Sequence, residues 1–237
     1  MEAGVIYCEL ALSVFKDLSL KQNAQLLTHT QVEGITPHQH YVEVRTNQGT
    51  YFSEKLMISV GAWSKKLLTS LGLELPLRPS RRTVGWFEAD QTLYSADHFP
   101  GFTLDLGDGQ SYYGFPCFDQ KGVKIGRHDG DREDDPDQLD RNFKSSDEQE
   151  LRRMLETYLP KAAGKLNTGR VGLYTFTPDS DFIIDQHPDL AGIVIAAGFS
   201  GHGFKFASVV GEIASQLLTG ERTNHNLAPF SLKRFQR

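Results

Sequence analysis

The stretch that decides the fold is Ile193–Leu218, which divides into three parts. Ile193–Ala197 (IVIAA) is a short, fully apolar run of the kind found in buried strands. Gly198-Phe199-Ser200-Gly201-His202-Gly203 follows directly, and Phe204–Leu218 then shows helical apolar periodicity before Gly220. The stretch therefore predicts a strand, a glycine-rich loop and a helix.

A loop of this kind is a physical candidate for a ligand site. The first backbone N–H groups of a helix have no partner within the helix, and the helix dipole adds partial positive charge there. Glycines let a planar ligand approach the backbone, and a reduced flavin carries negative charge near N1 and its C2 carbonyl. A simple tight turn at Gly201 and Gly203 explains the spacing equally well, and no Gly-Lys-Ser/Thr phosphate motif follows.

Outward from this stretch, both ends of the chain have α/β character. Lys55–Val60 (KLMISV) predicts a second buried strand, which runs into Gly61-Ala62-Trp63-Ser64 and a helix to Leu71. Phe182–Asp185 predicts a further strand. Near the N-terminus the pattern predicts three more elements: a helix at Leu10–Leu20, a short buried strand at Ala24–Thr28, and a hairpin of Tyr41–Arg45 with Thr50–Ser53.

The middle of the chain is rich in strands. Strand-like runs separated by turn residues predict an antiparallel sheet, and a helix is expected from Ser146 to about Tyr158. The runs are Thr83–Glu88, Tyr112–Phe115, Val123–Gly126 and Val171–Thr175. We therefore expect an α+β and α/β protein. Residues 1–76 and 177–237 would form one α/β domain, interrupted by an antiparallel-sheet domain at residues 77–176.

Composition restricts the setting and the partners. The 237 residues carry a net charge of −5 and no basic run, which argues against nucleic-acid and anionic-membrane partners. Cys8 and Cys117 have no metal-ligand spacing around them, so no metal site is expected and a reducing cytoplasm fits best. We expect neither a signal peptide nor a segment that spans a bilayer.

Several motifs together resemble one family. Ala196–Ser208 (AAGFSGHGFKFAS) and Thr177–Asp185 (TPDSDFIID) resemble the monomeric sarcosine oxidase and N-methyltryptophan oxidase family. The resemblance continues through Tyr112–Pro116 and Val123–Gly126, and Ile58–Ser64 (ISVGAWS) looks like an FAD-contacting strand of the wider D-amino-acid-oxidase-like superfamily. It implies FAD as cofactor and oxidation of the C–N bond of a small N-methyl amino acid. It also implies that residues 1–76 and 177–237 form a partial FAD-binding α/β domain, interrupted by an antiparallel-sheet substrate domain at residues 77–176. Dioxygen would reoxidise the flavin, giving an imine and hydrogen peroxide.

The resemblance also implies roles for individual residues. Lys205 matches the lysine that binds the substrate carboxylate, and Lys124 matches the lysine near the flavin that promotes oxygen reduction. From the residues alone, an outward-facing strand lysine is the better interpretation of Lys124, and only the resemblance reverses it. Tyr113 and His128 match active-site positions, and Tyr174 is expected to line the same substrate cavity. The residues expected to contact the flavin are Gly61, Ala62, Trp63, Gly201, His202, Gly203 and Lys205.

Two departures from the family pattern matter. The family attaches its flavin through a cysteine in a Cys-x-Tyr-Thr context, which here reads Gly172-Leu173-Tyr174-Thr175, so any flavin is expected to be non-covalent. No GxGxxG motif occurs in the 237 residues, so the βαβ unit that binds the ADP portion is expected to precede Glu2. Without that unit a sheet edge and an apolar face would be exposed, which favours a homodimer or poor solubility.

Three functional hypotheses follow. The first is an oxidase of N-methyl amino acids that is complete only with a further N-terminal segment. The second is a non-catalytic remnant or binding module that does not hold FAD, favoured by Gly172 and the missing GxGxxG motif. The third, which ranks last because the likeness is weaker outside Gly61–Ser64, is a glycine or D-amino acid oxidase.

Overall fold

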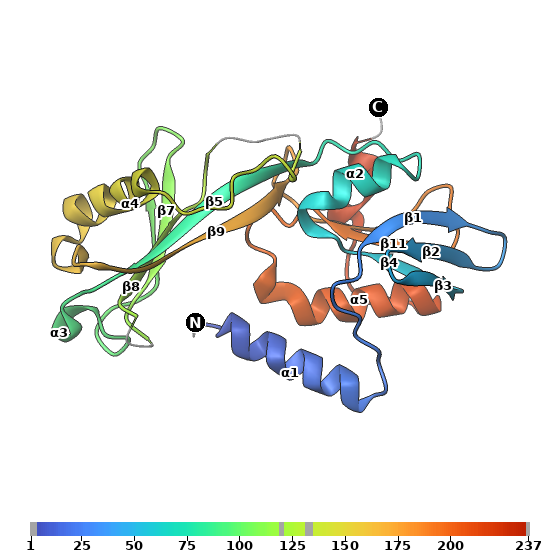
Figure 1. The fold of residues 1–237 in the computed structure, drawn as a ribbon, viewed down its shortest axis with the longest axis horizontal. Coiled ribbons are helices and arrows are strands. Elements are labelled where there is room, and N and C mark those ends of the chain that lie inside the picture. The colour runs from blue at the N-terminus through green and yellow to red at the C-terminus, as the bar shows by residue number, and fades with distance from the viewer. Residues whose placement is uncertain (1–3, 119–120, 131–134, 236–237) are drawn as a thin grey trace. The chain divides into compact units, whose positions relative to one another are not determined.

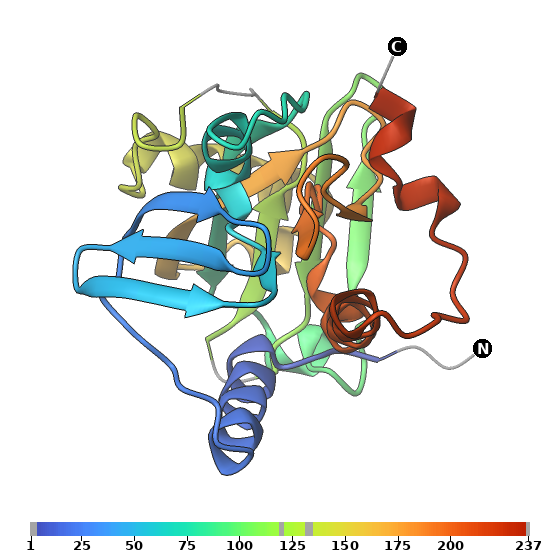
Figure 2. The same ribbon diagram turned by 90° about the vertical axis from the view of Figure 1, so that its right-hand side faces the viewer.

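The chain forms two compact units in a computed structural model, which describes residues 4–118, 121–130 and 135–235. The first unit comprises Met1–Pro76 and Thr177–Arg237, and the second comprises Leu77–Phe176. Figures 1 and 2 show the elements of each. The mixture of helices, a parallel strand pair and antiparallel sheets confirms the predicted α+β and α/β class.

The central sheet of the first unit has three strands in the order β10-β11-β4. β4 (Leu56–Ile58) and β11 (Ile193–Ala197) are parallel, whereas β10 (Ile183–Gln186) runs antiparallel to β11. All five residues of β11 are buried, as expected for a central strand made of IVIAA. The helix α5 (Ala207–Thr219) packs on this sheet by placing its apolar side chains against β10 and β11, in a cluster of Phe182, Ile184, Ala196, Val210 and Ile213.

The segment Phe204–Leu218, which the sequence predicts as one helix, forms two elements. Phe204–Phe206 form a 3-10 turn, and α5 begins only at Ala207 and ends at Gly220, which adopts a left-handed conformation with φ +78°. A similar pattern follows β4, where Gly61–Trp63 form a 3-10 turn before α2 (Ser64–Thr69). Both strands of the parallel pair are therefore followed by a short turn and then by a helix.

The N-terminal part of this unit contains one prediction that is wrong. The helix expected near Leu10–Leu20 is present as α1 (Cys8–Lys21), and the predicted hairpin consists of β2 (Val42–Thr46) and β3 (Gly49–Ser53). β1 (Val32–Pro37) completes a β1-β2-β3 meander. Ala24–Thr28 form no strand, because their backbone pairs with no ladder and Leu26 and Leu27 are exposed.

The α1 helix buries no residue. Its large apolar side chains are exposed on all sides, and Leu10 retains 64% of its accessible surface. The exposed set is Leu10, Leu12, Val14, Phe15, Leu18 and Leu20. Among the described residues, no helix is long and apolar enough to cross a membrane.

The second unit is a five-stranded antiparallel sheet with the strand order β6-β7-β8-β5-β9. Its strands are β5 (Arg78–Phe87), β6 (Phe102–Asp105), β7 (Ser111–Phe115), β8 (Val123–Arg127) and β9 (Leu166–Phe176). β5 and β9 are the longest, and they run side by side in Figure 1. Two helices accompany the sheet, the short α3 (Gln91–Tyr94) and the longer α4 (Ser145–Tyr158), and α4 covers one face.

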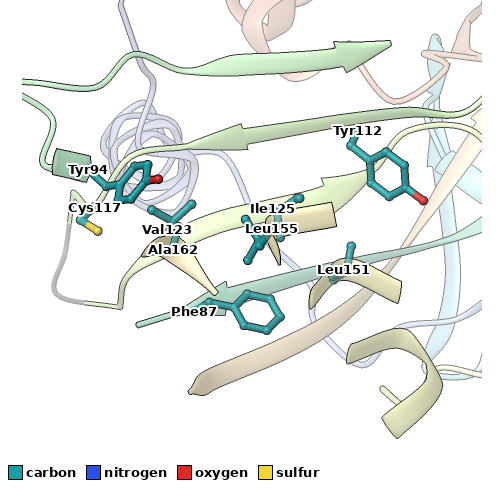
Figure 3. Close-up of a cluster of buried hydrophobic side chains, with 9 residues drawn as sticks. All are labelled: Phe87, Tyr94, Tyr112, Cys117, Val123, Ile125, Leu151, Leu155 and Ala162. Carbon is teal, nitrogen blue, oxygen red and sulfur yellow. The ribbon is translucent and has the colours of Figure 1, made fainter. Parts of the chain in front are cut away.

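The core of this unit lies between α4 and the sheet. Leu151 and Leu155 of α4 point toward Phe87 and Ile125 of the strands (Figure 3). The complete cluster is Phe87, Tyr94, Tyr112, Cys117, Val123, Ile125, Leu151, Leu155 and Ala162. Because side chains alternate along a strand, the neighbouring positions in β5, β7 and β8 face the other side of the sheet.

Candidate functional site

The predicted flavin-contacting residues of the first unit lie at one edge of its sheet. β4 and β11 are parallel and paired, with Ile58 opposite Ile195, so their carboxyl ends meet at the same edge. Gly61-Ala62-Trp63 follows β4, and the loop from Gly198 to Lys205 follows β11. The carboxyl edge of neighbouring parallel strands is where ligands of open α/β sheets gather.

The backbone of this edge is shaped by left-handed residues. Gly61 has φ +55°, Gly198 has φ +63° and Gly201 has φ +82°. Ser200, which is not a glycine, also has a positive φ of +49° and is 1% exposed. Its hydroxyl donates to the Gly198 carbonyl at 3.2 Å and accepts the Thr177 N–H at 3.4 Å, which stabilises the unusual conformation.

His202 connects the same loop to the segment before β10. Its Nε2 lies 3.2 Å from the Ser180 carbonyl oxygen, and its ring centroid lies 4.9 Å from that of Phe182. Gly203 is required for close packing, because a Cβ there would lie 2.6 Å from the Cβ of Phe199. The two segments that carry the family resemblance, Thr177–Asp185 and Ala196–Ser208, are thus fastened together by side-chain contacts and by the β10–β11 pairing.

Lys205 lies in the 3-10 turn Phe204–Phe206 and is exposed. Its ammonium lies 5.7 Å from the centroid of the Phe206 ring. Within the described part of the chain, no carboxylate forms an ion pair with it. An exposed cation at the amino-terminal end of a helical segment is disfavoured by the helix dipole, and an anionic ligand would offset that cost.

In the second unit, the structure places all four predicted site residues on one face of the sheet. Tyr112, Val123 and Ile125 belong to the core beneath α4. By alternation, Tyr113, Lys124 and His128 lie on the opposite face. Arg82 and Val84 lie two residues apart on β5 and therefore point to this same face. The Arg82 guanidinium contacts the Tyr174 ring, so Tyr174 lies on this face as well.

Three of these side chains form an aromatic cluster. The hydroxyl oxygens of Tyr113 and Tyr174 lie 3.2 Å apart, within hydrogen-bond distance. The centroid of the His128 ring lies 5.8 Å from that of Tyr174 and 6.2 Å from that of Phe176. Gly126 lies opposite Tyr113, and a Cβ at Gly126 would lie 3.0 Å from Cζ of Tyr113. The absence of a side chain at position 126 therefore lets the Tyr113 ring lie over β8.

Arg82 is a central member of the cluster that the sequence did not reveal. It is 5% exposed, and its guanidinium carbon lies 5.7 Å from the Tyr174 ring centroid and 5.2 Å from that of Phe176. Its Nε donates to the His128 carbonyl oxygen at 2.8 Å. The alternation of side chains along β5 could have revealed it. Arg81 points to the same side of the strand as the core residue Phe87, whereas Arg82 points to the opposite side.

The opposite face, under α4, holds a network of paired charges. Arg81 donates to both carboxylate oxygens of Asp147, at 2.9 and 2.7 Å, and Arg127 pairs with Asp129 at 2.7 Å and with Glu150. Burial by itself raises the pKa of Asp147, but hydrogen bonds from Arg81 and the Lys144 N–H outweigh it and lower that pKa. These groups line a cavity of about 380 Å³. Since its charges neutralise one another, we assign it to the attachment of α4.

Position 172 is open. Gly172 is exposed, and in the described part of the chain no atom outside its immediate neighbours lies within 4 Å of where a Cβ would be. The same is true of Gly61. Both glycines therefore leave the backbone accessible to a planar group, which is the property that a flavin ring requires.

Comparison with known proteins is consistent with these features. The model of a protein family described as FAD dependent oxidoreductase matches residues 1–217. The chain is 45% identical over 235 residues to monomeric sarcosine oxidase of Bacillus sp. (strain NS-129), covering 98% of this chain and 60% of that protein. It is 35% identical over 236 residues to N-methyl-L-tryptophan oxidase of Salmonella heidelberg (strain SL476), covering 99% and 62%.

A similar fold occurs among solved structures. Glycine oxidase from Geobacillus kaustophilus superposes with a TM-score of 0.76 at 24% identity, over 89% of this chain and 54% of that one. The chain thus spans about three fifths of the length of the curated relatives it matches.

Proposed function

Because the chain belongs to the FAD dependent oxidoreductase family, we propose that it forms the flavin-ring and substrate part of an oxidase of N-methyl amino acids, of the sarcosine or N-methyltryptophan type. The family membership confirms the resemblance read from the sequence, and with it FAD as the family's cofactor. The observation that carries the proposal is the 45% identity to monomeric sarcosine oxidase together with the tyrosine, histidine and lysine side chains that share one sheet face.

In this proposal the two units have different roles. Residues 1–76 with 177–237 hold the flavin, and residues 77–176 hold the substrate. The whole enzyme includes a further N-terminal segment that binds the ADP portion of FAD. Support comes from the parallel pair of β4 and β11, whose carboxyl ends carry Gly61 and the Gly201 loop at one edge.

Bound FAD would supply the two-electron redox chemistry by which a substrate C–N bond is oxidised to an imine and dioxygen is reduced to hydrogen peroxide. The protein binds and orients the substrate. Lys205 binds the substrate carboxylate by a charge-assisted hydrogen bond. Tyr113, Tyr174 and His128 shape the pocket around the amine, and Lys124 supplies a fixed positive charge for the reaction with dioxygen. The imine product is released and hydrolysed.

We further propose that the flavin is held without a covalent bond. Gly172 occupies the position of the family's flavin-linking cysteine, and glycine has no sulfur with which to form a thioether. Cys117 is buried in the core beneath α4 and Cys8 is exposed on α1, so neither thiol belongs to the aromatic cluster. Two cysteines without metal-ligand or CxxC spacing fit a reducing, cytoplasmic setting.

The partners in this proposal are a small N-methyl amino acid and dioxygen, with neither nucleic acid nor membrane. A homodimer is supported by the apolar surface of α1. The second candidate function is a binding module that keeps the substrate pocket but does not hold FAD. Gly172 and the lack of a GxGxxG motif in these 237 residues favour that alternative.

One experiment separates the two functions. The purified chain is incubated with FAD, free ligand is removed, and the visible absorption spectrum is recorded. A retained flavin spectrum supports the oxidase, and peroxide production is then assayed with sarcosine and with N-methyltryptophan. Loss of all flavin from this chain, together with tight binding of N-methyl amino acids, would establish the binding module instead.

A further inference from the structure

Lys124 occupies a distinctive position in the sheet of the second unit. It lies on β8, the central strand, and its direct cross-strand neighbours are Trp86 on β5 and Phe115 on β7. All three side chains point away from α4, since Val123 and Ile125 on either side of Lys124 belong to the core. The lysine therefore has an aromatic ring on each side along the same row.

The ammonium contacts both rings. Nζ of Lys124 lies 5.0 Å from the centroid of the Trp86 ring and 5.6 Å from that of Phe115. Both distances fall within the range of about 6 Å over which the negative face of an aromatic ring attracts a cation. Trp86 is half-buried, as are Lys124 and Phe115, so the attraction is less weakened by water than it is at a fully exposed site.

A lysine side chain has many rotamers. Holding its flexible four-carbon stem in one geometry costs rotamer entropy. A charge that assists a reaction is effective only if it already stands where charge develops, because reorganisation during the reaction cancels part of the benefit. Two aromatic neighbours fixed by strand register meet that requirement.

We infer that Trp86 and Phe115 are positioning residues that hold the Lys124 ammonium in place for the reaction with dioxygen. The inference rests on the proposed function, in which Lys124 serves that step. Trp86 also contacts the guanidinium carbon of Arg170, at 5.9 Å from its ring centroid. Phe115 therefore provides the independent test, because the cation over its ring is Lys124.

The first measurement needs no cofactor. Lysines of the full chain are reductively methylated with ¹³C-formaldehyde, and the Lys124 signal is assigned by its loss in Lys124→Met. Ring currents are expected to move this signal upfield of the other lysines. Trp86→Leu and Phe115→Leu should each move it back toward them, whereas Trp86→Phe should retain most of the shift. An unshifted signal, or one indifferent to both leucine variants, would overturn the inference.

The second measurement uses the FAD-loaded protein. Trp86→Leu and Phe115→Leu should each slow flavin reoxidation by dioxygen about 3- to 30-fold, while anaerobic reduction by sarcosine changes less than about twofold. Adding either change to Lys124→Met should have no further effect on reoxidation. Equal losses with and without Lys124 would show that the rings act only in packing. Failure to load FAD would contradict the proposed function, but the resonance measurement would still decide the placement of Lys124.

Discussion

The hydroxyl oxygens of Tyr113 and Tyr174 lie 3.2 Å apart, although their strands are not neighbours. β7 and β9 are separated by β8 and β5, so the two side chains meet across about 14 Å of sheet, or three strand spacings. Gly126 on β8 makes this possible because it leaves the surface below the Tyr113 ring empty. The two tyrosines thus join both halves of the sheet on the face opposite α4.

This bond can be measured by a double-mutant cycle. Tyr113→Phe and Tyr174→Phe should each lower the free energy of unfolding by about 1 kcal/mol, the usual net value of such a hydrogen bond. The double variant should lose little more than either single variant, since both remove the same bond. Urea unfolding supplies the values, and Tyr41→Phe, in the other unit, is the control. Full additivity would show that the hydroxyls do not interact.

Gly126 should tolerate no side chain. A Cβ at this position would lie 2.7 Å from Cγ1 of Val84 and 3.0 Å from Cζ of Tyr113, so Gly126→Ala is expected to cost about 1–3 kcal/mol. Gly211→Ala is the matched control, because no atom outside the helix lies within 4 Å of its Cβ position and α5 should gain about 1 kcal/mol. In denaturant unfolding, the midpoint should therefore fall for Gly126→Ala and rise for Gly211→Ala.

Position 172 should accept a cysteine. Gly172 has open space around its Cβ position and a φ that any residue adopts, so Gly172→Cys is expected to fold normally. With FAD and dioxygen as oxidant, the new thiol should form a covalent bond to the flavin, leaving yellow colour on the acid-precipitated protein. The unmodified chain and Gly172→Ser should release all their flavin. Colour on the unmodified pellet would disprove non-covalent binding.

Lys205 should decide the affinity for the substrate carboxylate. In the FAD-loaded protein, Lys205→Ala is expected to weaken binding of a carboxylate-bearing ligand by about 2 kcal/mol, or roughly 30-fold, because the carboxylate loses a charge-assisted hydrogen bond. Spectral titration of the flavin with methylthioacetate measures this directly. Lys233→Ala, another exposed lysine near the C-terminus, should have no effect. Unchanged affinity in Lys205→Ala would assign the carboxylate to another residue.

Tyr112 makes stability sensitive to alkaline pH. Burial, reinforced by the neighbouring Glu150 carboxylate, raises the pKa of Tyr112 from 10.0 to about 12. The unfolded chain loses this proton more readily than the folded one, so the stabilisation is complete below pH 10 and is lost as the pH rises toward about 12. Unfolding free energies measured across this range should fall less steeply in Tyr112→Phe, whereas Tyr158→Phe, an exposed control, should follow the original curve.

Much of the fold was predictable because local patterns and tertiary structure agree. IVIAA became β11, and KLMISV contains β4. The prediction of a strand at Ala24–Thr28 was wrong. A short apolar run becomes a strand only where a partner strand supplies hydrogen bonds, and the local sequence does not show whether such a partner exists. β1 was missed because Gly34 and Pro37 are unfavourable in strands, yet pairing with β2 overrides the preference.

The candidate site was harder to predict from the sequence than the fold was. Residues 113, 124, 128 and 174 were named from a resemblance, and only strand register shows that they share a face. Arg82 was missed because an arginine beside another arginine looks like a solvated pair. In the structure the two point to opposite sides of β5, with Arg81 donating to the Asp147 carboxylate of α4 and Arg82 donating to the His128 carbonyl oxygen.

The exposed α1 helix has a consequence for how the chain behaves. Its 14 residues bury nothing, so tertiary packing contributes little to the helix, and an isolated helix of that length is marginal in water. Amide hydrogens of Cys8–Lys21 should therefore exchange with solvent almost as fast as those of an unstructured peptide. Any macromolecule that covers Leu10, Phe15 and Leu18 would slow that exchange. The amide exchange rate of this segment therefore reports whether a partner is bound to it.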